Sequence, residues 1–194
     1  LKTMPHISVK LVSFQHSKIF NLQNGNVYEE KLKNDSDFVI LDDYVQLSFF
    51  KKNTVKLDNL ISLIQDFKPH IIHSHLFLAE LFSREILFEG VKYFSHCHDN
   101  MEQLQIFSIK NIFSKKLITN YFEKRYLIKK YLKCNNSFIS ISKDISNYYN
   151  NVLPKKLKNN ISFLPNAIDF ENFTNPKKRV WRNNKTLHLV SVGS

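Results

Sequence analysis

The sequence predicts an α/β fold built on a doubly wound parallel sheet, that is, a sheet of parallel strands with helices on both faces. Two observations carry this prediction. Short apolar runs of strand length alternate along the chain with segments whose apolar residues recur at helical spacing. The clearest example spans residues 68–100, where two such strands flank one helix. Strands that alternate with helices indicate parallel pairing through crossover connections.

In the first half of the chain, a β-branched alternating run predicts a strand at 8–14 and an apolar run predicts another at 37–41. Between them, the Asn-rich stretch 20–36 predicts a hairpin that ends near Val27 and Tyr28. One apolar face predicts a helix over 55–67, capped by Asn53 or Thr54. Residues 71–74 and 91–95 are the next strands, and the helix between them is expected over 76–88 with Gly90 as its C-cap.

In the second half, residues 101–133 are expected to be mostly helical with a break near 110–114. The run SFISIS predicts a strand at 137–142, and Ser142 is expected to cap a helix over 143–149. A short strand at 161–164 follows. The basic, polar stretch 175–186 is expected to be a linker, and 187–194 to open a new domain with a strand.

Composition narrows the class of protein and its partners. The 194 residues carry a net charge of +11, with Lys+Arg 28 against Asp+Glu 17. Two explanations of this positive charge stay open: an anionic partner, and a general enrichment of the sequence in Lys and Asn. Cys97 and Cys134 are too few for a disulfide framework, which favours a reduced, cytoplasmic setting. We find no secretory leader and no apolar run of membrane length, and the chain reads as a fragment.

The helix expected at 115–133 concentrates the positive charge. It holds seven basic residues against the single acid Glu123, and an apolar stripe is expected at Leu117, Tyr121, Ile128 and Leu132. A solvated outer face explains this pattern, and so does attraction to the anionic lipid of a membrane surface through Lys115–Lys133. Nucleic acid is not expected as a partner, because no aromatic platform or reader motif accompanies the charge.

Two histidine pairs, His73/His75 and His96/His98, fall where strands are expected to end. The carboxyl ends of parallel strands form the edge where open α/β sheets bind ligands. A zinc site is one interpretation, but further ligands downstream would be needed, so no metal is predicted. His73, nearest the strand core, is expected to be structural. His98 with Asp99 is the strongest site candidate, since a loop imidazole can bind a hydroxyl or act as a base.

Several stretches in order resemble the N-terminal half of family 4 glycosyltransferases, particularly bacterial enzymes that build cell-surface polysaccharides. These stretches are KPHIIHSH, VKYFSHCHDN, FISISKDISNYY, ISFLPNAIDFENF and LHLVSVGS, and they span about residues 55–194. The resemblance implies a two-domain GT-B architecture of Rossmann-like domains. It implies retaining transfer of a sugar from a nucleotide-sugar donor to a glycan or lipid-linked acceptor, with no cofactor and no bound metal.

Carried across residue by residue, the resemblance places His98 and Asp99 at the catalytic centre. Its substrate-binding residues would be His75, His96, Asn100, Ser142 and Asn166, with Asp169 in the segment that leads to the interdomain hinge. Residues 1–174 would form the acceptor-side domain without its first strand and helix. The donor-binding residues would lie beyond Ser194, so the fragment alone is expected to be inactive.

The sequence departs from the family pattern at two positions. His70 stands where an Asp is usual, and Ala167 stands where a Gly is usual, which removes a residue tolerant of positive φ. Two other classes therefore stay open: a metal-dependent hydrolase that uses the His-x-His pairs, and a noncatalytic binding module on the same scaffold. The expected location is the cytoplasm, with a possible peripheral position on the inner face of the plasma membrane.

Overall fold

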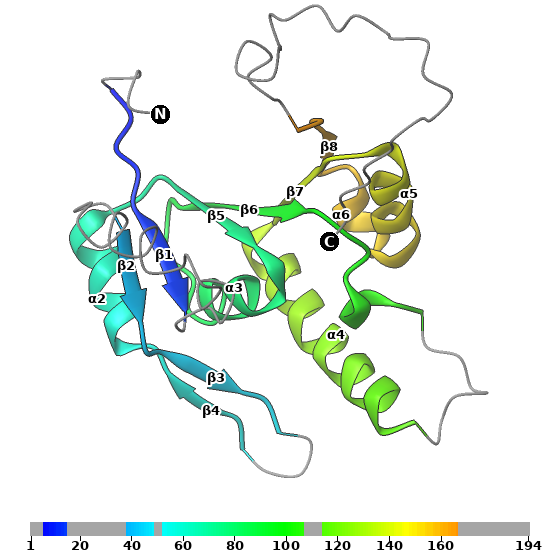
Figure 1. Ribbon diagram of the computed structural model, residues 1–194, viewed down its shortest axis with the longest axis horizontal. Coiled ribbons are helices and arrows are strands. Elements are labelled where there is room, and N and C mark those ends of the chain that lie inside the picture. The colour runs from blue at the N-terminus through cyan, green and yellow to red at the C-terminus, as the bar shows by residue number, and fades with distance from the viewer. Residues whose placement is uncertain (1–5, 15–37, 49–51, 107–113, 167–194) are drawn as a thin grey trace, which may run out of the picture.

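The computed structural model describes residues 6–14, 38–48, 52–106 and 114–166. Four strands come first, and from the fourth onward helical segments separate each strand from the next, as Figure 1 shows. The strands are β1 (Leu11–Phe14), β2 (Phe38–Leu41), β3 (Tyr44–Gln46), β4 (Thr54–Lys56), β5 (Ile71–His75), β6 (Lys92–Cys97), β7 (Ser137–Ser140) and β8 (Ile161–Phe163). The helices are α2 (Asp58–Phe67), α3 (Leu76–Ser83), the 3-10 turn η2 (Glu102–Leu104), α4 (Lys115–Cys134), α5 (Lys143–Val152) and α6 (Lys155–Lys158).

The largest described sheet is parallel throughout and has the order β5-β6-β7-β8 (Figure 1). Its register pairs His75 with His96 and Cys97 with Ser140. The predicted parallel pairing of these segments is therefore confirmed. The described part of the chain is an α/β structure whose parallel sheet is flanked by helices, which is compatible with a Rossmann-like fold. Two further pairs lie outside this sheet, namely parallel β1-β2 and the antiparallel hairpin β3-β4.

One buried core cluster lies against one face of the β5-β8 sheet, and a second is formed mainly by β2, β3, α2 and α3. Strands that follow one another in sequential order place right-handed crossover helices on the same face. Phe138 of β7 is fully buried there, packed against Tyr131 of α4 and Tyr149 of α5. On β5 the alternate residues point the other way, and Ile71, His73 and His75 are exposed. The open face of the sheet therefore carries the histidines.

A buried polar network joins the opposite, buried face of the sheet to α3 and α4. The guanidinium of Arg84, fully buried, donates to Oδ1 of Asn136 and to the hydroxyls of Ser74, Ser83 and Ser95 at 2.8–3.1 Å. Oε2 of Glu80 accepts hydrogen bonds from Ser95 and from the hydroxyl of Tyr131. Burial is the main cause that raises the pKa of Glu80. Because buried polar groups cost free energy unless they are paired, this network fixes the positions of β5, β6 and β7.

Several element boundaries differ from those predicted. Helix α2 begins at Asp58 because residues 54–56 pair with β3, so neither Asn53 nor Thr54 caps it. The carboxylate of Asp43 instead accepts from the backbone N–H of Leu60 at 2.6 Å, close to the helix start. The strands predicted at 8–14, 37–41, 137–142 and 161–164 are found as β1, β2, β7 and β8, with ends shifted by a few residues.

Two helices also differ in detail. Helix α3 ends at Ser83 with Arg84 as its C-cap, well before Gly90, because buried hydrogen bonds hold the Ser83 and Arg84 side chains. Of the predicted stripe on helix α4, Ile128 and Leu132 pack against the core, whereas Tyr121 is 42% exposed. The buried residues of the helix are Asn120, Leu127 and Tyr131. The predicted hairpin at 20–36, the linker at 175–186 and the strand at 187–192 lie outside the described residues.

Candidate functional site

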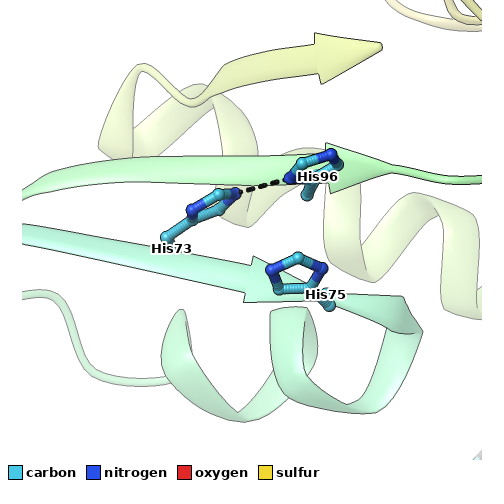
Figure 2. A group of neighbouring side chains, drawn as sticks. All are labelled: His73, His75 and His96. Atoms are coloured by element: carbon cyan, nitrogen blue, oxygen red, sulfur yellow. Dashed lines mark hydrogen bonds between the residues drawn. The ribbon is translucent and has the colours of Figure 1, made fainter. Parts of the chain in front are cut away.

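Strands β5 and β6 bring four imidazoles together on the open face of the sheet. His73 and His75 are two residues apart on β5, so their side chains point to the same face. The register places His96 of β6 opposite His75. Figure 2 shows His75 and His96 at the carboxyl ends of the two strands, and His73 further back along β5 with its ring directed toward His96. His98 follows directly after β6 and joins the group.

The four rings are stacked and joined in two hydrogen-bonded pairs. Nδ1 of His96 lies 3.1 Å from Nε2 of His73, and Nδ1 of His75 lies 2.7 Å from Nε2 of His98. Each pair spans 23 residues of the chain. The ring planes of His96 and His98 are within 5° of parallel, with centroids 4.5 Å apart. We call these four residues the histidine cluster.

The surroundings of His73, His75 and His96 favour the uncharged form of these three rings. Partial burial, followed by repulsion from the neighbouring imidazoles, lowers the pKa of His75 to about 4. Burial and the charge of His98 also lower the pKa of His73 and that of His96. Neutral imidazoles can accept a proton, bind a hydroxyl or ligate a metal. Nε2 of His96 is buried and has no hydrogen-bond partner among the described residues.

Three members of the cluster could hold a metal ion. His73, His75 and His96 each offer a ring nitrogen, and these three atoms lie within 4.8 Å of one another. The sequence predicted His73, nearest the strand core, to be structural, and this role stays a prediction. Because β5 turns its odd-numbered residues outward, His73 is exposed and lies against His96. The equal 23-residue offset of the two His-x-His pairs was a signal for this contact.

The structure brings together some of the predicted site residues. His75, His96 and His98 lie in one cluster, and His96 lies inside β6 rather than in a loop. Asp99 and Asn100 are exposed in the loop after β6. Among the described residues no hydrogen bond joins Asp99 to His98. The Asp99 carboxylate instead contributes, after burial, to raising the pKa of Tyr148 to about 12.

The remaining predicted residues follow the ends of the next two strands. Ser142 comes just after β7, and its hydroxyl accepts from the backbone N–H of Ile145 at 3.2 Å. It therefore caps α5, as the sequence predicted. Asn166 is exposed, three residues past the end of β8. Asp169 and Ala167 lie outside the described residues.

Cys97 lies between two of the histidines in sequence but on the opposite face of the sheet. It is 2% exposed, and burial raises the pKa of its thiol to about 12. A thiol with so little thiolate at neutral pH is a poor nucleophile.

Helix α4 uses part of its positive charge inside the protein. Nζ of Lys124 donates to the carbonyl of Leu104 at 2.7 Å, and Nζ of Lys130 lies 3.0 Å from a carboxylate oxygen of Glu85. These two lysines therefore do not belong to a free outer face. Lys115, Lys129 and Lys133 are exposed. In the described part of the chain, we find no helix with the length and apolarity needed to cross a membrane.

The sequence was also compared with known proteins. No model of a protein family matches the chain, and no curated protein is significantly similar to it.

Proposed function

We propose that this chain is the acceptor-side part of a retaining glycosyltransferase with GT-B architecture. On this proposal, residues 1–174 bind a glycan or lipid-linked acceptor, and a second Rossmann-like domain binds the nucleotide sugar. His98 contacts the transferred sugar, with Asp99 beside it in the loop. The protein works at the cytoplasmic face of the membrane, where lipid-linked acceptors are found.

The observation that carries the proposal is the position of four sequence motifs on four adjacent strands. The histidine pairs and the segments around Ser142 and Asn166 each lie at or just past the carboxyl end of one strand, from β5 to β8. Because these strands are parallel and neighbours, the four ends share one edge. Open α/β sheets bind their ligands at that edge. The proposed reaction, sugar transfer, comes from the resemblance to family 4 glycosyltransferases, because the motifs that carry this resemblance lie at this edge.

The chemistry of the edge suits sugar transfer. Neutral imidazoles and polar loop residues can hydrogen-bond hydroxyl groups, which are the main polar groups of a sugar. His98 is exposed and already held in place by its hydrogen bond to His75. A group positioned in this way can stabilise the charge that develops as the nucleotide leaves.

The test is sugar transfer by the complete gene product. The purified protein would be incubated with membranes as the acceptor source and a panel of radiolabelled nucleoside-diphosphate sugars. We expect one donor to give label in the lipid or polysaccharide fraction and to release nucleotide in step with that label. If every donor remains intact with membranes present, the proposal is wrong. Transfer with inversion of the anomeric configuration would also contradict it.

A further inference from the structure

The histidine cluster supports an inference that goes beyond sugar transfer and does not rest on it. We propose that His73, His75 and His96 bind a divalent transition-metal ion of the zinc class and leave one coordination position open. The sequence did not predict a metal, because further ligands downstream were expected to be needed. The register of β5 and β6 brings three ring nitrogens together from the two pairs alone.

The first argument is the separation of the nitrogen atoms. Zn–N bonds of 2.0–2.1 Å in tetrahedral geometry place two ligand nitrogens about 3.3 Å apart. Nε2 of His73 and Nδ1 of His96 already lie 3.1 Å apart. An ion between them would replace one hydrogen bond with two metal–nitrogen bonds. The ligand nitrogens of His73, His75 and His96 all lie within 4.8 Å of one another, and the exposed side chain of His75 has room to approach the ion.

The second argument is the kind of ligand. The three donors are imidazole nitrogens from rigid strands, and no carboxylate is among them. Imidazole suits Zn²⁺, Cu²⁺ and Ni²⁺, whereas Mg²⁺ and Ca²⁺ prefer oxygen. Metal ligation needs an unprotonated ring, and partial burial together with the neighbouring rings lowers the pKa of all three histidines. Because neutral rings attract anions weakly, a phosphate is the poorer candidate for this cluster.

The third argument is the role left for His98. It lies beyond the end of β6, and its Nε2 is bonded to Nδ1 of His75 at 2.7 Å. That bond leaves Nε2 of His75 available to the ion. Histidine ligands commonly bond a second group through their other ring nitrogen, which fixes the orientation of the ring. We therefore assign His98 as a positioning residue and not as a ligand.

The experiment uses the full 194-residue chain without a histidine tag, stripped of metal with a chelator. Calorimetric titration with Zn²⁺ should show one high-affinity equivalent per chain. Co²⁺ should give the intense visible bands of a tetrahedral site. X-ray absorption of the zinc-loaded chain should show three nitrogen neighbours from imidazole at about 2.0–2.1 Å.

Single substitutions identify the ligands. His73→Asn, His75→Asn and His96→Asn should each weaken Zn²⁺ binding by about 100-fold or more, while His98→Asn should weaken it by about 10–100-fold. His70→Asn is the matched control, because His70 lies just before β5 at the opposite edge of the sheet and should leave binding unchanged. Circular dichroism checks that each variant is folded.

Three results would overturn the proposal: no saturable Zn²⁺ binding, ligand variants that bind like His70→Asn, or fewer than three imidazoles in the absorption spectrum of the unmodified chain. The X-ray absorption measurement uses the unmodified chain. It therefore tests the proposal even if a substitution disturbs folding. Binding of inorganic phosphate at this cluster in place of Zn²⁺ would also count against it. Failure here would leave sugar transfer untouched, since that is measured as label in the acceptor.

Discussion

Nε of Arg84 donates a hydrogen bond to Oδ1 of Asn136 at 2.8 Å, between residues 52 positions apart in the chain. This bond joins the end of α3 to the residue before β7, directly behind β6. Both side chains are fully buried, and the rings of Tyr93 and Tyr131 lie within 6 Å of the guanidinium. The sheet edge that carries the histidine cluster is therefore supported from the opposite face by a charged group without access to water.

Removing the guanidinium should be strongly destabilising. We expect Arg84→Met to lower the free energy of unfolding by about 3–5 kcal/mol, because Glu80 and several buried hydroxyls would lose their partner. Arg84→Lys should also be costly, since an ammonium cannot reproduce the fork of donors. Urea unfolding followed by circular dichroism measures the change. The control is Arg125→Met on the exposed side of α4, expected to stay within about 0.5 kcal/mol. Equal effects of the two methionine variants would contradict this prediction.

The sequence predicted the elements with strong local signals. Strands β5, β6 and β7 and the capped start of α5 follow from apolar runs, Pro69 and Ser142, which act over a few residues. The β3-β4 hairpin was missed because it has three-residue strands, and β4 is exposed along its length. The buried face of α4 was predicted only in part, because Asn120 and Tyr131 are buried with polar partners in other elements that the sequence does not reveal.

The histidine cluster depends on tertiary structure. The spacing in the sequence placed His75 and His96 near one edge of the sheet. The register of β5 and β6 determines which histidines of the two strands are neighbours. Register in turn is fixed by the side chains of the buried face, such as Ser95 and Phe138, which pair across β6 and β7. The outward direction of His73 follows from the same alternation. A shift of β5 by one residue would turn the side chain of His73 to the buried face of the sheet.

The stability of the metal-free chain should fall in mild acid. The ordinary pKa of histidine is 6.5, and that of His75 is lowered to about 4 in the folded state. Between these values the unfolded chain binds a proton at this position and the folded chain does not, so stability is lost as the pH falls from about 6.5 toward 4. Urea midpoints at about pH 7.5 and about pH 5 with a chelator present measure the loss.

A substitution tests whether the cluster causes this pH dependence. His75→Asn should reduce the difference between the two midpoints, and His70→Asn should retain it in full. Because His75 is exposed, solvent screens part of the loss of stability. We therefore predict the direction of the change in midpoint and not its size. A midpoint that does not change, or that rises, between about pH 7.5 and about pH 5 would show that the cluster does not disfavour protonation.

Ser142 has a structural role that can be separated from a role in substrate binding. Ser142→Ala should cost about 1 kcal/mol, because the N–H of Ile145 would lose its capping acceptor. Ser142→Asp should retain most of the stability, since a carboxylate also caps and suits the helix dipole. Thermal melts of the chain measure both. If the alanine variant melts like the unmodified chain, the cap contributes nothing; if both variants are stable but impair sugar transfer, the hydroxyl contacts substrate.

Membrane attraction should depend on the exposed lysines of α4. Replacing Lys115, Lys129 and Lys133 with Ser should reduce flotation with anionic vesicles, since each basic residue near such a surface contributes about 1 kcal/mol. The same charge change made at Lys143, Lys155 and Lys156, which are exposed on α5 and α6, is the matched control and should have a smaller effect. Binding should weaken as salt rises. Equal effects of both triple variants would indicate a general charge effect, and binding to neutral vesicles would contradict an electrostatic mechanism.

His98 provides the sharpest test of the proposed reaction. In the complete gene product, His98→Ala should lower turnover of the nucleotide sugar by about 100-fold or more, because a positioned imidazole at the sheet edge would be lost. The side chain is exposed and makes its hydrogen bond to His75 on the surface, so the melting temperature should change little. His70→Ala is the control at the opposite edge and should turn over normally. Near-normal turnover of His98→Ala would contradict the catalytic assignment, and early melting would identify His98 as a structural residue. A loss of turnover that added Zn²⁺ restores would instead assign the effect of His98 to the metal site.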